Sequence, residues 1–370
     1  MSIAKTADVL FKPFEGGGLK LANRVIMAPM TRAFSPGGIP GPDVAGYYRR
    51  RAENGVGLII TEGTVINHPA AAASPNVPHF YGEEALAGWQ KVVNEVHEAG
   101  GKIAPQIWHT GTARQRETFP ESNADPIGPS GLNLSGKQVS EPLTKQEIRE
   151  LVQAYAQSAA DAKRLGFDAV EIHGAHGYLI DQFFWEVTNK RTDEYGGDLV
   201  GRTRFAVEVI EAIRAAVGPD FPIIFRFSQW KDGHYNVKLA ATPEELERFL
   251  APLSAAGVDI FHASTRRFWE PEFEGSELNL AGWTRKLTAK PTITVGSVGL
   301  NSEFTSLFAS GQGGETTGIE QLVERLERGE FDLVAVGRAL LTDPAWAAKI
   351  RDGRLDELQP FTKEDLTKLS

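Results

Sequence analysis

The sequence predicts an α/β protein whose fold class is a (β/α)8 TIM barrel, and three observations lead to that expectation. Short runs of apolar residues recur along the chain, as expected of parallel strands that are buried on both faces. Helical patterns separate most of these runs, which is typical of parallel strands joined by helical crossovers. No GxGxxG turn follows an early strand, so a doubly wound dinucleotide-binding sheet is the weaker alternative.

Apolar runs give the positions of the expected strands. They cover residues 24–28, 57–61, 102–108, 167–172, 222–227, 258–262, 291–295 and 331–336. A Gly-rich turn between two short apolar segments at 10–24 predicts a small N-terminal hairpin ahead of the first strand.

Helical periodicity and end signals give the expected helices. They cover residues 42–54, 83–99, 143–165, 201–217, 242–255, 319–328 and 344–351. The longest of them opens with Thr144 and has Glu147 three residues later, which is a capping-box pattern. Thr242 is the expected N-cap of a later helix.

Two loop insertions interrupt the alternation and are expected to lie over the barrel mouth. Residues 110–142 are rich in Gly, Pro, Ser and Asn, without a helical period, and a short hairpin is expected around Gly136. The second insertion, 266–281, begins with RRFWEPEFEG, and its Phe268 and Trp269 are expected to contact substrate. Residues 1–370 together are expected to form one domain.

Composition and charge exclude several classes of protein. The formal net charge of -9 makes binding to nucleic acid or to an anionic membrane unexpected. The chain has no Cys, which excludes disulfides, thiolate nucleophiles and Cys-ligated Fe–S clusters. No secretory signal and no run long enough to span a membrane are visible, so a cytoplasmic location is expected. The sequence leaves open whether the protein is a monomer or a homodimer.

The stretch EIHGAHGYLIDQFF at 171–184 carries the residues best suited to chemistry. His173, His176 and Tyr178 follow a predicted strand, where Gly residues allow a tight turn. Two neutral imidazoles can donate hydrogen bonds to one substrate oxygen, and a phenol can deliver a proton. The plain alternative is that these side chains only satisfy local backbone groups. No metal is expected, because no carboxylate or Cys with ligand spacing accompanies the two His residues.

Other polar residues end the predicted strands, and a barrel brings strand ends to one face. They are Thr31, Glu62, Gln106, His109, His173, His176, Arg226, Ser297 and Arg338. Gly296-Ser297 and Gly337-Arg338 follow the last two strands, where glycines and a guanidinium suit a phosphate. FMN fits this set, because Arg226 could stabilise an anionic reduced ring and Gln106 could bond its pyrimidine edge.

Several motifs together resemble the Old Yellow Enzyme family of FMN-dependent ene-reductases. The motifs are NRVIMAPMTR (23–32), EGT (62–64), PQIWHTG (105–111), HGAHGYLIDQFF (173–184), NKRTDEYGG (189–197), the strand with Arg226 and the two late Gly turns. They extend over nearly the whole chain, and their combination is specific, although each motif alone is not.

The resemblance implies a function and a role for each matching residue. It implies an oxidoreductase that uses NADPH or NADH to reduce the C=C bond of small activated alkenes, such as α,β-unsaturated carbonyls and nitroalkenes, by a ping-pong mechanism. His173 and His176 would bind the substrate oxygen, and Tyr178 would supply the proton. Noncovalent FMN would contact Pro29, Met30, Thr31, Gly63, Gln106, Arg226, Gly296, Ser297, Gly337 and Arg338.

Other functions are also conceivable for a barrel with a phosphate site. Iron–sulfur relatives of this family are excluded because the chain has no Cys. A phosphate-binding aldolase or isomerase would use a Schiff-base Lys or a carboxylate base, and no Lys is expected at the strand ends. A non-catalytic flavin-binding protein would not need His173, His176 and Tyr178.

Overall fold

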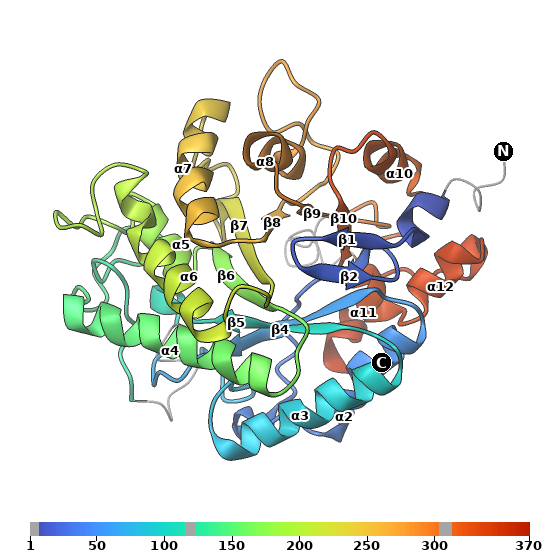
Figure 1. The fold of residues 1–370 in the computed structure, drawn as a ribbon, viewed down its shortest axis with the longest axis horizontal. Coiled ribbons are helices and arrows are strands. Elements are labelled where there is room, and N and C mark those ends of the chain that lie inside the picture. Colours follow the sequence, from blue (N-terminus) through green and yellow to red (C-terminus); the bar gives the residue numbers. More distant parts are fainter. Residues whose placement is uncertain (1–6, 115–122, 303–312) are drawn as a thin grey trace.

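The computed structural model describes residues 7–114, 123–302 and 313–370, and its centre is a closed parallel barrel (Figure 1). The barrel order is β10-β3-β4-β5-β6-β7-β8-β9. Its strands are β3 (Val25–Met27), β4 (Leu58–Val65), β5 (Ile103–Trp108), β6 (Val170–His176), β7 (Ile223–Lys231), β8 (Ile260–Ser264), β9 (Thr292–Val295) and β10 (Leu333–Val336). Every neighbouring pair is parallel, which confirms the predicted fold class.

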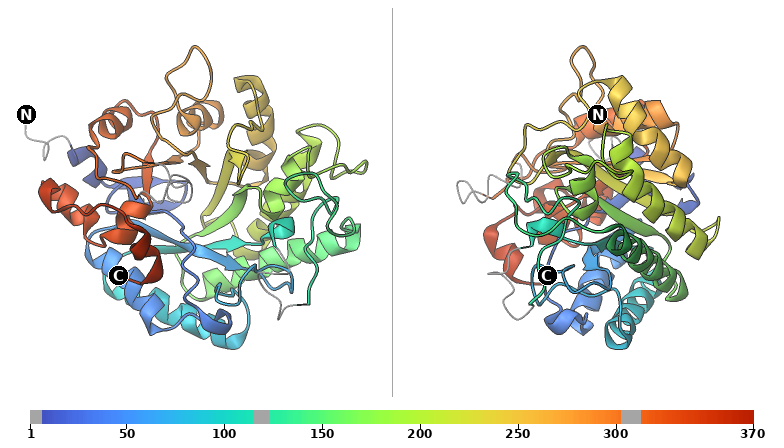
Figure 2. Two further views of the ribbon diagram at one scale, coloured as in Figure 1. Left: turned by 180° about the vertical axis from the view of Figure 1, so that it is seen from behind. Right: turned by 90° about the vertical axis from the view of Figure 1, so that its left-hand side faces the viewer.

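Helices surround the barrel on its outer side, as the views from behind and from the side show (Figure 2). They are α2 (Pro42–Glu53), α3 (Glu83–Glu98), α4 (Lys145–Arg164), α5 (Leu179–Phe184), α6 (Arg204–Val217), α7 (Pro243–Ala256), α8 (Leu280–Thr288), α10 (Glu320–Glu327), α11 (Arg338–Thr342) and α12 (Trp346–Arg351). Short 3-10 turns lie at Ala7–Phe11, Pro36–Gly38, Gly111–Ala113, Gly201–Thr203, Leu355–Glu357 and Lys363–Thr367.

The seven expected helices are confirmed, and the described residues contain three further helices that were not predicted. The capping box of α4 is present, with Thr144 Oγ1 accepting from the Glu147 backbone N–H at 3.2 Å. Helices α5 and α11 are too short for a periodic pattern to show. Helix α8 was missed because its sequence LAGWTRKLT contains a Gly and two Thr, which are weak helix formers.

A β-hairpin fills the N-terminal end of the barrel. It consists of β1 (Phe14–Gly16) and β2 (Leu19–Leu21), as expected for residues 10–24. Its apolar side chains join inward-facing residues of the barrel in one buried cluster, which includes Ile260. Gly17 has a φ of +55°, and a Cβ there would lie 2.4 Å from Ile260 Cγ1. The hairpin therefore packs against the bottom of the barrel too closely for a side chain at this position.

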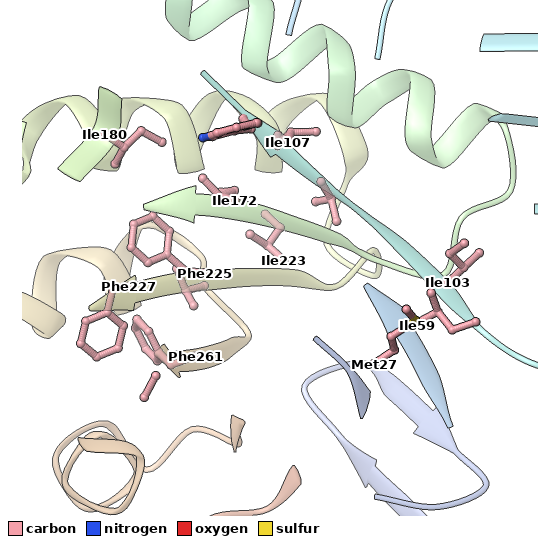
Figure 3. Close-up of a cluster of buried hydrophobic side chains, with 14 of the residues drawn as sticks. Met27, Ile59, Ile103, Ile107, Ile172, Ile180, Ile223, Phe225, Phe227 and Phe261 are labelled. Atoms are coloured by element: carbon pink, nitrogen blue, oxygen red, sulfur yellow. The ribbon is translucent and has the colours of Figure 1, made fainter. Parts of the chain in front are cut away.

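The strands alternate between the barrel interior and the helical shell, because successive side chains of a strand point to opposite faces. Outward-facing residues pack beneath the helices in the larger hydrophobic cluster (Figure 3). Those labelled on the strands are Met27, Ile59, Ile103, Ile107, Ile172, Ile223, Phe225, Phe227 and Phe261. The residues between them, such as Ile224 and Ile260, face the interior.

Three strands are longer than the sequence suggested. Strand β4 extends to Val65, although residues 62–64 were expected to form a turn. Strand β6 extends through His176, and β7 extends to Lys231. His173 therefore lies within strand β6 and His176 is its last residue, so the two are not together in the following turn. The expectation that no Lys ends a strand was wrong, since Lys231 is the last residue of β7. The residues SQWK at 228–231 lack the apolar character by which the strand was recognised.

The two loop insertions are placed as follows. Within 110–142, an antiparallel bridge joins Leu132 to Gln138, so the short hairpin around Gly136 is confirmed. Residues 115–122 of this insertion lie outside the described part of the chain. The second insertion, 266–281, is irregular except for its last two residues, which begin α8. That 1–370 forms one domain stays a prediction.

Candidate active site

A cavity of about 370 Å³ opens where the barrel strands end at their C-termini. It is lined by nearly all of the predicted site residues, which come from segments far apart in the sequence. These are Pro29, Met30, Thr31, Gly63, Gln106, His173, His176, Tyr178, Arg226, Gly296, Ser297, Gly337 and Arg338. The volume is within the range of small-molecule and cofactor pockets.

The inward-facing positions of β6, β7 and β8 explain how the cavity obtains its chemistry. Read from the bottom of the barrel, these positions are Ala169-Glu171-His173, Ile224-Arg226-Ser228 and Ile260-His262-Ser264. Each series begins with an apolar residue and then becomes polar. The lower barrel is therefore a hydrophobic core, whereas the upper barrel holds buried polar side chains next to the cavity.

His173, His176 and Tyr178 lie next to one another in the cavity wall. The ring of His173 is 5.2 Å from that of His176 and 5.0 Å from that of Tyr178, measured between centroids. Trp108 packs edge-on against Tyr178 at 4.8 Å, and Trp230 stacks on His176 at 4.4 Å. Trp108 also stacks on His173 at 6.0 Å, so the two indoles together pack against all three side chains.

Hydrogen bonds indicate which ring nitrogen of each imidazole is a donor. His173 Nδ1 accepts from the Ala175 backbone N–H at 3.3 Å, so a neutral His173 carries its proton on Nε2. His176 Nε2 lies 2.7 Å from Ser264 Oγ, which itself accepts from Arg226 Nη2 at 3.3 Å. Because Arg226 only donates, the Ser264 hydroxyl keeps its own proton available for His176 Nε2; when Ser264 donates in this contact, a neutral His176 carries its proton on Nδ1.

Burial sets the protonation states of these groups. It lowers the pKa of both His173 and His176 well below the usual value, and the nearby Arg226 guanidinium lowers them further. Both imidazoles are thus neutral hydrogen-bond donors near pH 7. Burial and the neighbouring carboxylate of Asp232 raise the pKa of Tyr178 to about 12, so the phenol keeps its proton.

Buried polar groups below the cavity support Gln106 and Arg226. Gln106 Nε2 donates to Glu171 Oε1 at 2.8 Å, and His262 Nδ1 lies 2.7 Å from Glu171 Oε2. Burial lowers the pKa of Arg226, whereas the Glu171 carboxylate opposes that change. Within the part of the chain that the structure describes, Arg226 Nε is buried and has no hydrogen-bond partner.

The turns after β9 and β10 face each other across one side of the cavity. Arg338 Nη2 donates to Ser297 Oγ at 3.3 Å, so the guanidinium and the hydroxyl form one polar group. Gly337 is open on the cavity side, where a Cβ would meet only Met30 Sδ at 3.5 Å and Ala28 Cβ at 3.9 Å. The arrangement leaves room for an anionic group to approach the backbone.

The turn after β3 is held by a buried carboxylate. Glu62 Oε2 accepts from the backbone N–H groups of Arg32 at 2.8 Å and Ala33 at 2.9 Å, which fixes the position of Met30 and Thr31. Burial raises the pKa of Glu62 to about 7. Glu62 does not line the cavity; its function is to shape the turn.

His109, another predicted strand-end residue, lies outside the cavity lining. Its Nδ1 accepts from the Gly111 N–H at 2.9 Å, and its Nε2 lies 3.2 Å from His68 Nδ1. Its contacts are therefore those of a residue that orders the loop after β5. Among the described residues, no group of three or more His, Cys, Asp and Glu could hold a metal ion.

Phe268 and Trp269 do not line the cavity, which corrects the expectation that they contact substrate. Phe268 is buried in the hydrophobic core, and Trp269 packs against the same core. Their backbone carbonyls accept from Asn279 and Arg325, which turns this segment toward α8 and α10. From the sequence alone, an aromatic residue in a loop after a strand can equally well line a pocket or pack in the core.

Several cavity residues were not predicted from the sequence. The most polar of them are Asp232, Tyr235, Ser264 and Arg266, and the largest apolar ones are Trp108 and Trp230. The guanidinium of Arg266 lies over the ring of Tyr235 at 4.3 Å, and Tyr235 Oη donates to Asp232 at 2.9 Å. Ser264 could have been found from the sequence, because it lies two residues beyond His262 on the same face of β8.

Comparison with known proteins identifies the family. The model of the NADH:flavin oxidoreductase / NADH oxidase family matches residues 9–357. The chain belongs to this family. The expectation of an FMN-dependent NAD(P)H oxidoreductase of the ene-reductase type is therefore confirmed.

Individual relatives support the assignment. The chain is 34% identical to 12-oxophytodienoate reductase 7 of Oryza sativa subsp. japonica, over 92% of this chain and 87% of that protein. It is 36% identical to an NADH oxidase of Thermoanaerobacter brockii, over 95% of this chain but only 52% of that longer protein.

Solved structures of the family have the same fold. Morphinone reductase in complex with tetrahydroNAD matches with a TM-score of 0.79 at 30% identity, covering 96% of this chain and 93% of that one. Old Yellow Enzyme from a Pichia species matches with a TM-score of 0.79 at 26% identity, covering 97% and 90% of the two chains.

Proposed function

We propose that this flavin oxidoreductase reduces activated alkenes in the cavity described above, with NADPH or NADH as the reductant. His173 and His176 bind the oxygen of the electron-withdrawing group, and Tyr178 is the proton donor. The observation that carries the proposal is the proximity of these three side chains, 5.0–5.2 Å between ring centroids, in one cavity with Arg226 and Arg338.

The residues present fit FMN. Arg226 Nε is buried and unpaired among the described residues, so an acceptor on a ligand ring would satisfy it. Gln106 and Gly63 line the same part of the cavity. On another side, Ser297 and Arg338 supply a hydroxyl and a guanidinium to a phosphate, and Gly337 leaves space for it. Gly296 lines the same side of the cavity, where the absence of a side chain lets the turn pack against Thr265. Pro29, Met30 and Thr31 complete the lining next to β3.

FMN, when bound, supplies hydride transfer from the nicotinamide to the alkene. The protein supplies binding, orientation and the proton. The Nε2–H of His173 and the Nδ1–H of His176 donate to one substrate oxygen and stabilise the negative charge that develops there. Tyr178 then protonates the carbon next to the polarised group. Its pKa of about 12 keeps the phenol in the acid form that this step needs.

A Schiff-base aldolase remains excluded, although not because the strand ends lack a Lys, as was expected from the sequence. Lys231 does end a strand, but it is fully buried, is ion-paired with Asp181 at 2.9 Å and does not line the cavity. Its amine therefore cannot reach a substrate carbonyl. A flavin-storage protein would have no use for a pair of oriented imidazoles beside a protonated phenol.

Other aspects of the proposal rest on the sequence. The prediction that the protein binds neither nucleic acid nor an anionic membrane follows from its net charge, and the prediction of a cytoplasmic location follows from the lack of a visible secretory signal or membrane-length apolar run. The sequence leaves open whether the protein is a monomer or a homodimer. As a separate finding, the described ranges 7–114, 123–302 and 313–370 contain no helix both long and apolar enough to cross a membrane.

The test is a flavin titration followed by anaerobic turnover. The purified protein should bind one FMN per chain, the bound flavin should bleach with NADPH or NADH, and 2-cyclohexenone should restore its yellow colour. A protein that takes up no FMN would overturn the proposal. A protein whose bleached flavin is reoxidised by oxygen but not by any activated alkene would overturn the assignment of the substrate class.

A further inference from the structure

The turn that joins His176 to Tyr178 has an unfavourable backbone conformation. His176 has a φ of +63° and Gly177 a φ of +83°, so two successive residues lie in the left-handed region. This region is costly for a residue with a Cβ such as His, and a strained backbone persists only where its surroundings hold it. The strain lies at the residues that would set the geometry of substrate binding.

Four hydrogen bonds satisfy the backbone groups of this turn. From the side of β7, Ser228 Oγ accepts from the His176 N–H at 3.0 Å, and the Asp232 N–H donates to the His176 carbonyl at 3.1 Å. From α5, Asp181 Oδ2 accepts from the Gly177 N–H and Gln182 Nε2 donates to the Gly177 carbonyl, both at 2.7 Å. The turn is thus held by hydrogen bonds from the end of β7 on one side and from the first turn of α5 on the other.

One ion pair joins the two elements that hold the turn, β7 and α5. Lys231 Nζ, at the end of β7, lies 2.9 Å from Asp181 Oδ1 in α5, and both side chains are 0% exposed. Lys231 is also the register partner of His176 in the β6–β7 pair. The carboxylate therefore binds the turn with one oxygen and the neighbouring strand with the other.

We propose that Asp181 and Lys231 are positioning residues that hold His176 and Tyr178 in their reactive geometry. Neither side chain lines the cavity, so their effect is transmitted through the backbone of the turn. The inference rests on the proposed function, because it assumes that His176 and Tyr178 act on a substrate. A displacement of reacting groups by about 1 Å can slow a reaction by roughly 100-fold, so a rigid turn has kinetic value.

The test compares variants of the holoenzyme with a matched control. Asp181→Asn removes the charge but keeps an acceptor for the Gly177 N–H, Lys231→Met removes the ammonium, and the double variant removes both charges. The control is Glu330→Gln, which breaks another buried ion pair, Arg325–Glu330 at 3.0 Å with 7% and 5% exposure. That pair lies outside the cavity lining.

Three quantities are measured for each variant. They are the melting temperature, the affinity for 4-hydroxybenzaldehyde from its long-wavelength charge-transfer band, and amide hydrogen exchange in the peptide that contains Gly177. In the single variants we expect the phenol to bind roughly 10- to 100-fold more weakly, with faster exchange at the turn. Reoxidation by 2-cyclohexenone should slow more than reduction by NADPH, because it also needs the proton of Tyr178.

The double variant separates positioning from stability. It leaves no unpaired buried charge, so its melting temperature should recover toward that of the wild type, whereas phenol affinity and exchange should stay impaired. If phenol affinity recovers together with stability, or if Glu330→Gln shows the same loss of affinity, the pair is merely structural and the inference is wrong. A wild-type protein that gives no phenol band would instead count against the proposed function. If the single variants do not fold, the double variant carries the test.

Discussion

The hydroxyl of Ser264 lies 2.7 Å from Nε2 of His176, and this contact connects the two functional halves of the cavity. Ser264 Oγ also accepts from Arg226 at 3.3 Å. Arg226 faces the proposed flavin, whereas His176 faces the proposed substrate. Ser264 thus contacts the imidazole of His176 and also the guanidinium of Arg226, the residue that would hold the cofactor.

Replacing Ser264 should therefore weaken ligand binding without removing the flavin. Ser264→Ala leaves His176 free to change its tautomer, and loss of one such hydrogen bond predicts a roughly 3- to 10-fold weaker affinity for 4-hydroxybenzaldehyde. Ser264→Thr keeps the hydroxyl and should retain most of the affinity. Imidazole 15N shifts should report the proton of His176 on Nδ1 in the wild type. A shift pattern with the proton on Nε2 would contradict the assignment.

Removing both imidazoles should abolish the phenol complex. In His173→Ala/His176→Ala the bound phenolate has lost both donors in a partly dry pocket, and each such donor typically contributes about 3 kcal/mol to a developing oxyanion. We expect no charge-transfer band, very slow alkene reduction, and a flavin that stays yellow and reducible by a chemical reductant. An intact band in the double variant would mean that phenols bind elsewhere.

Tyr178→Phe should affect the two half-reactions differently. Only the alkene half-reaction needs a proton from the phenol, so flavin reduction by NADPH should be little changed. Nitroalkenes should be slowed less than enones, because their nitronate product is stable without immediate protonation. With the pKa of Tyr178 at about 12, the wild-type alkene step should show no loss of its acid between pH 6 and 9. Equal slowing of both half-reactions would mean that the phenol positions ligands and that the proton comes from elsewhere.

Arg338→Ala should release FMN. Loss of a charge-assisted contact to a phosphate predicts a roughly 10- to 100-fold rise in the dissociation constant, measured by fluorescence as the flavin is released. Arg285→Ala is a suitable control, because Arg285 is half-exposed and pairs with Asp332 outside the cavity. Unchanged retention in Arg338→Ala would show that the phosphate has been placed at the wrong turn.

The free energy of unfolding should decrease as the pH falls below the pKa of an unperturbed histidine. Burial lowers the pKa of His109 well below its usual value of 6.5, so below pH 6.5 the unfolded chain binds a proton that the folded chain does not. The free energy of unfolding therefore falls with decreasing pH in this range. His109→Gln should flatten the decline in melting temperature between pH 6.5 and 5, compared with wild type. An unchanged slope would show that His109 does not contribute to it.

The sequence predicted the barrel because buried parallel strands and their helices leave strong local patterns. It also placed His173, His176 and Tyr178 correctly at one cavity, since all strand C-termini share a face. Glu171, His262 and Ser264 required one more step, namely the two-residue alternation of each strand once its inward face was known. Whether those side chains contact one another depends on register between strands, which local sequence does not specify.

Other features lay beyond local patterns altogether. The ion pair of Asp181 and Lys231 joins residues 50 positions apart, and the polar end of β7 resembles a loop. Phe268 was misplaced for the same reason, because an aromatic side chain suits a pocket and a core equally well. In each case the deciding interaction is tertiary.

The hairpin that seals the bottom of the barrel has a kinetic consequence. That end is filled by the apolar side chains of Phe14, Leu19 and Leu21. The reductant and the alkene must therefore both enter through the cavity opening at the opposite end. Each molecule then obstructs the other while it is bound. At high concentration, NADPH should occupy the reduced enzyme unproductively and slow turnover, and excess alkene should relieve this inhibition by competition. Steady-state rates should therefore pass through a maximum as the reductant is raised, and this maximum should move to higher NADPH concentrations as more alkene is supplied.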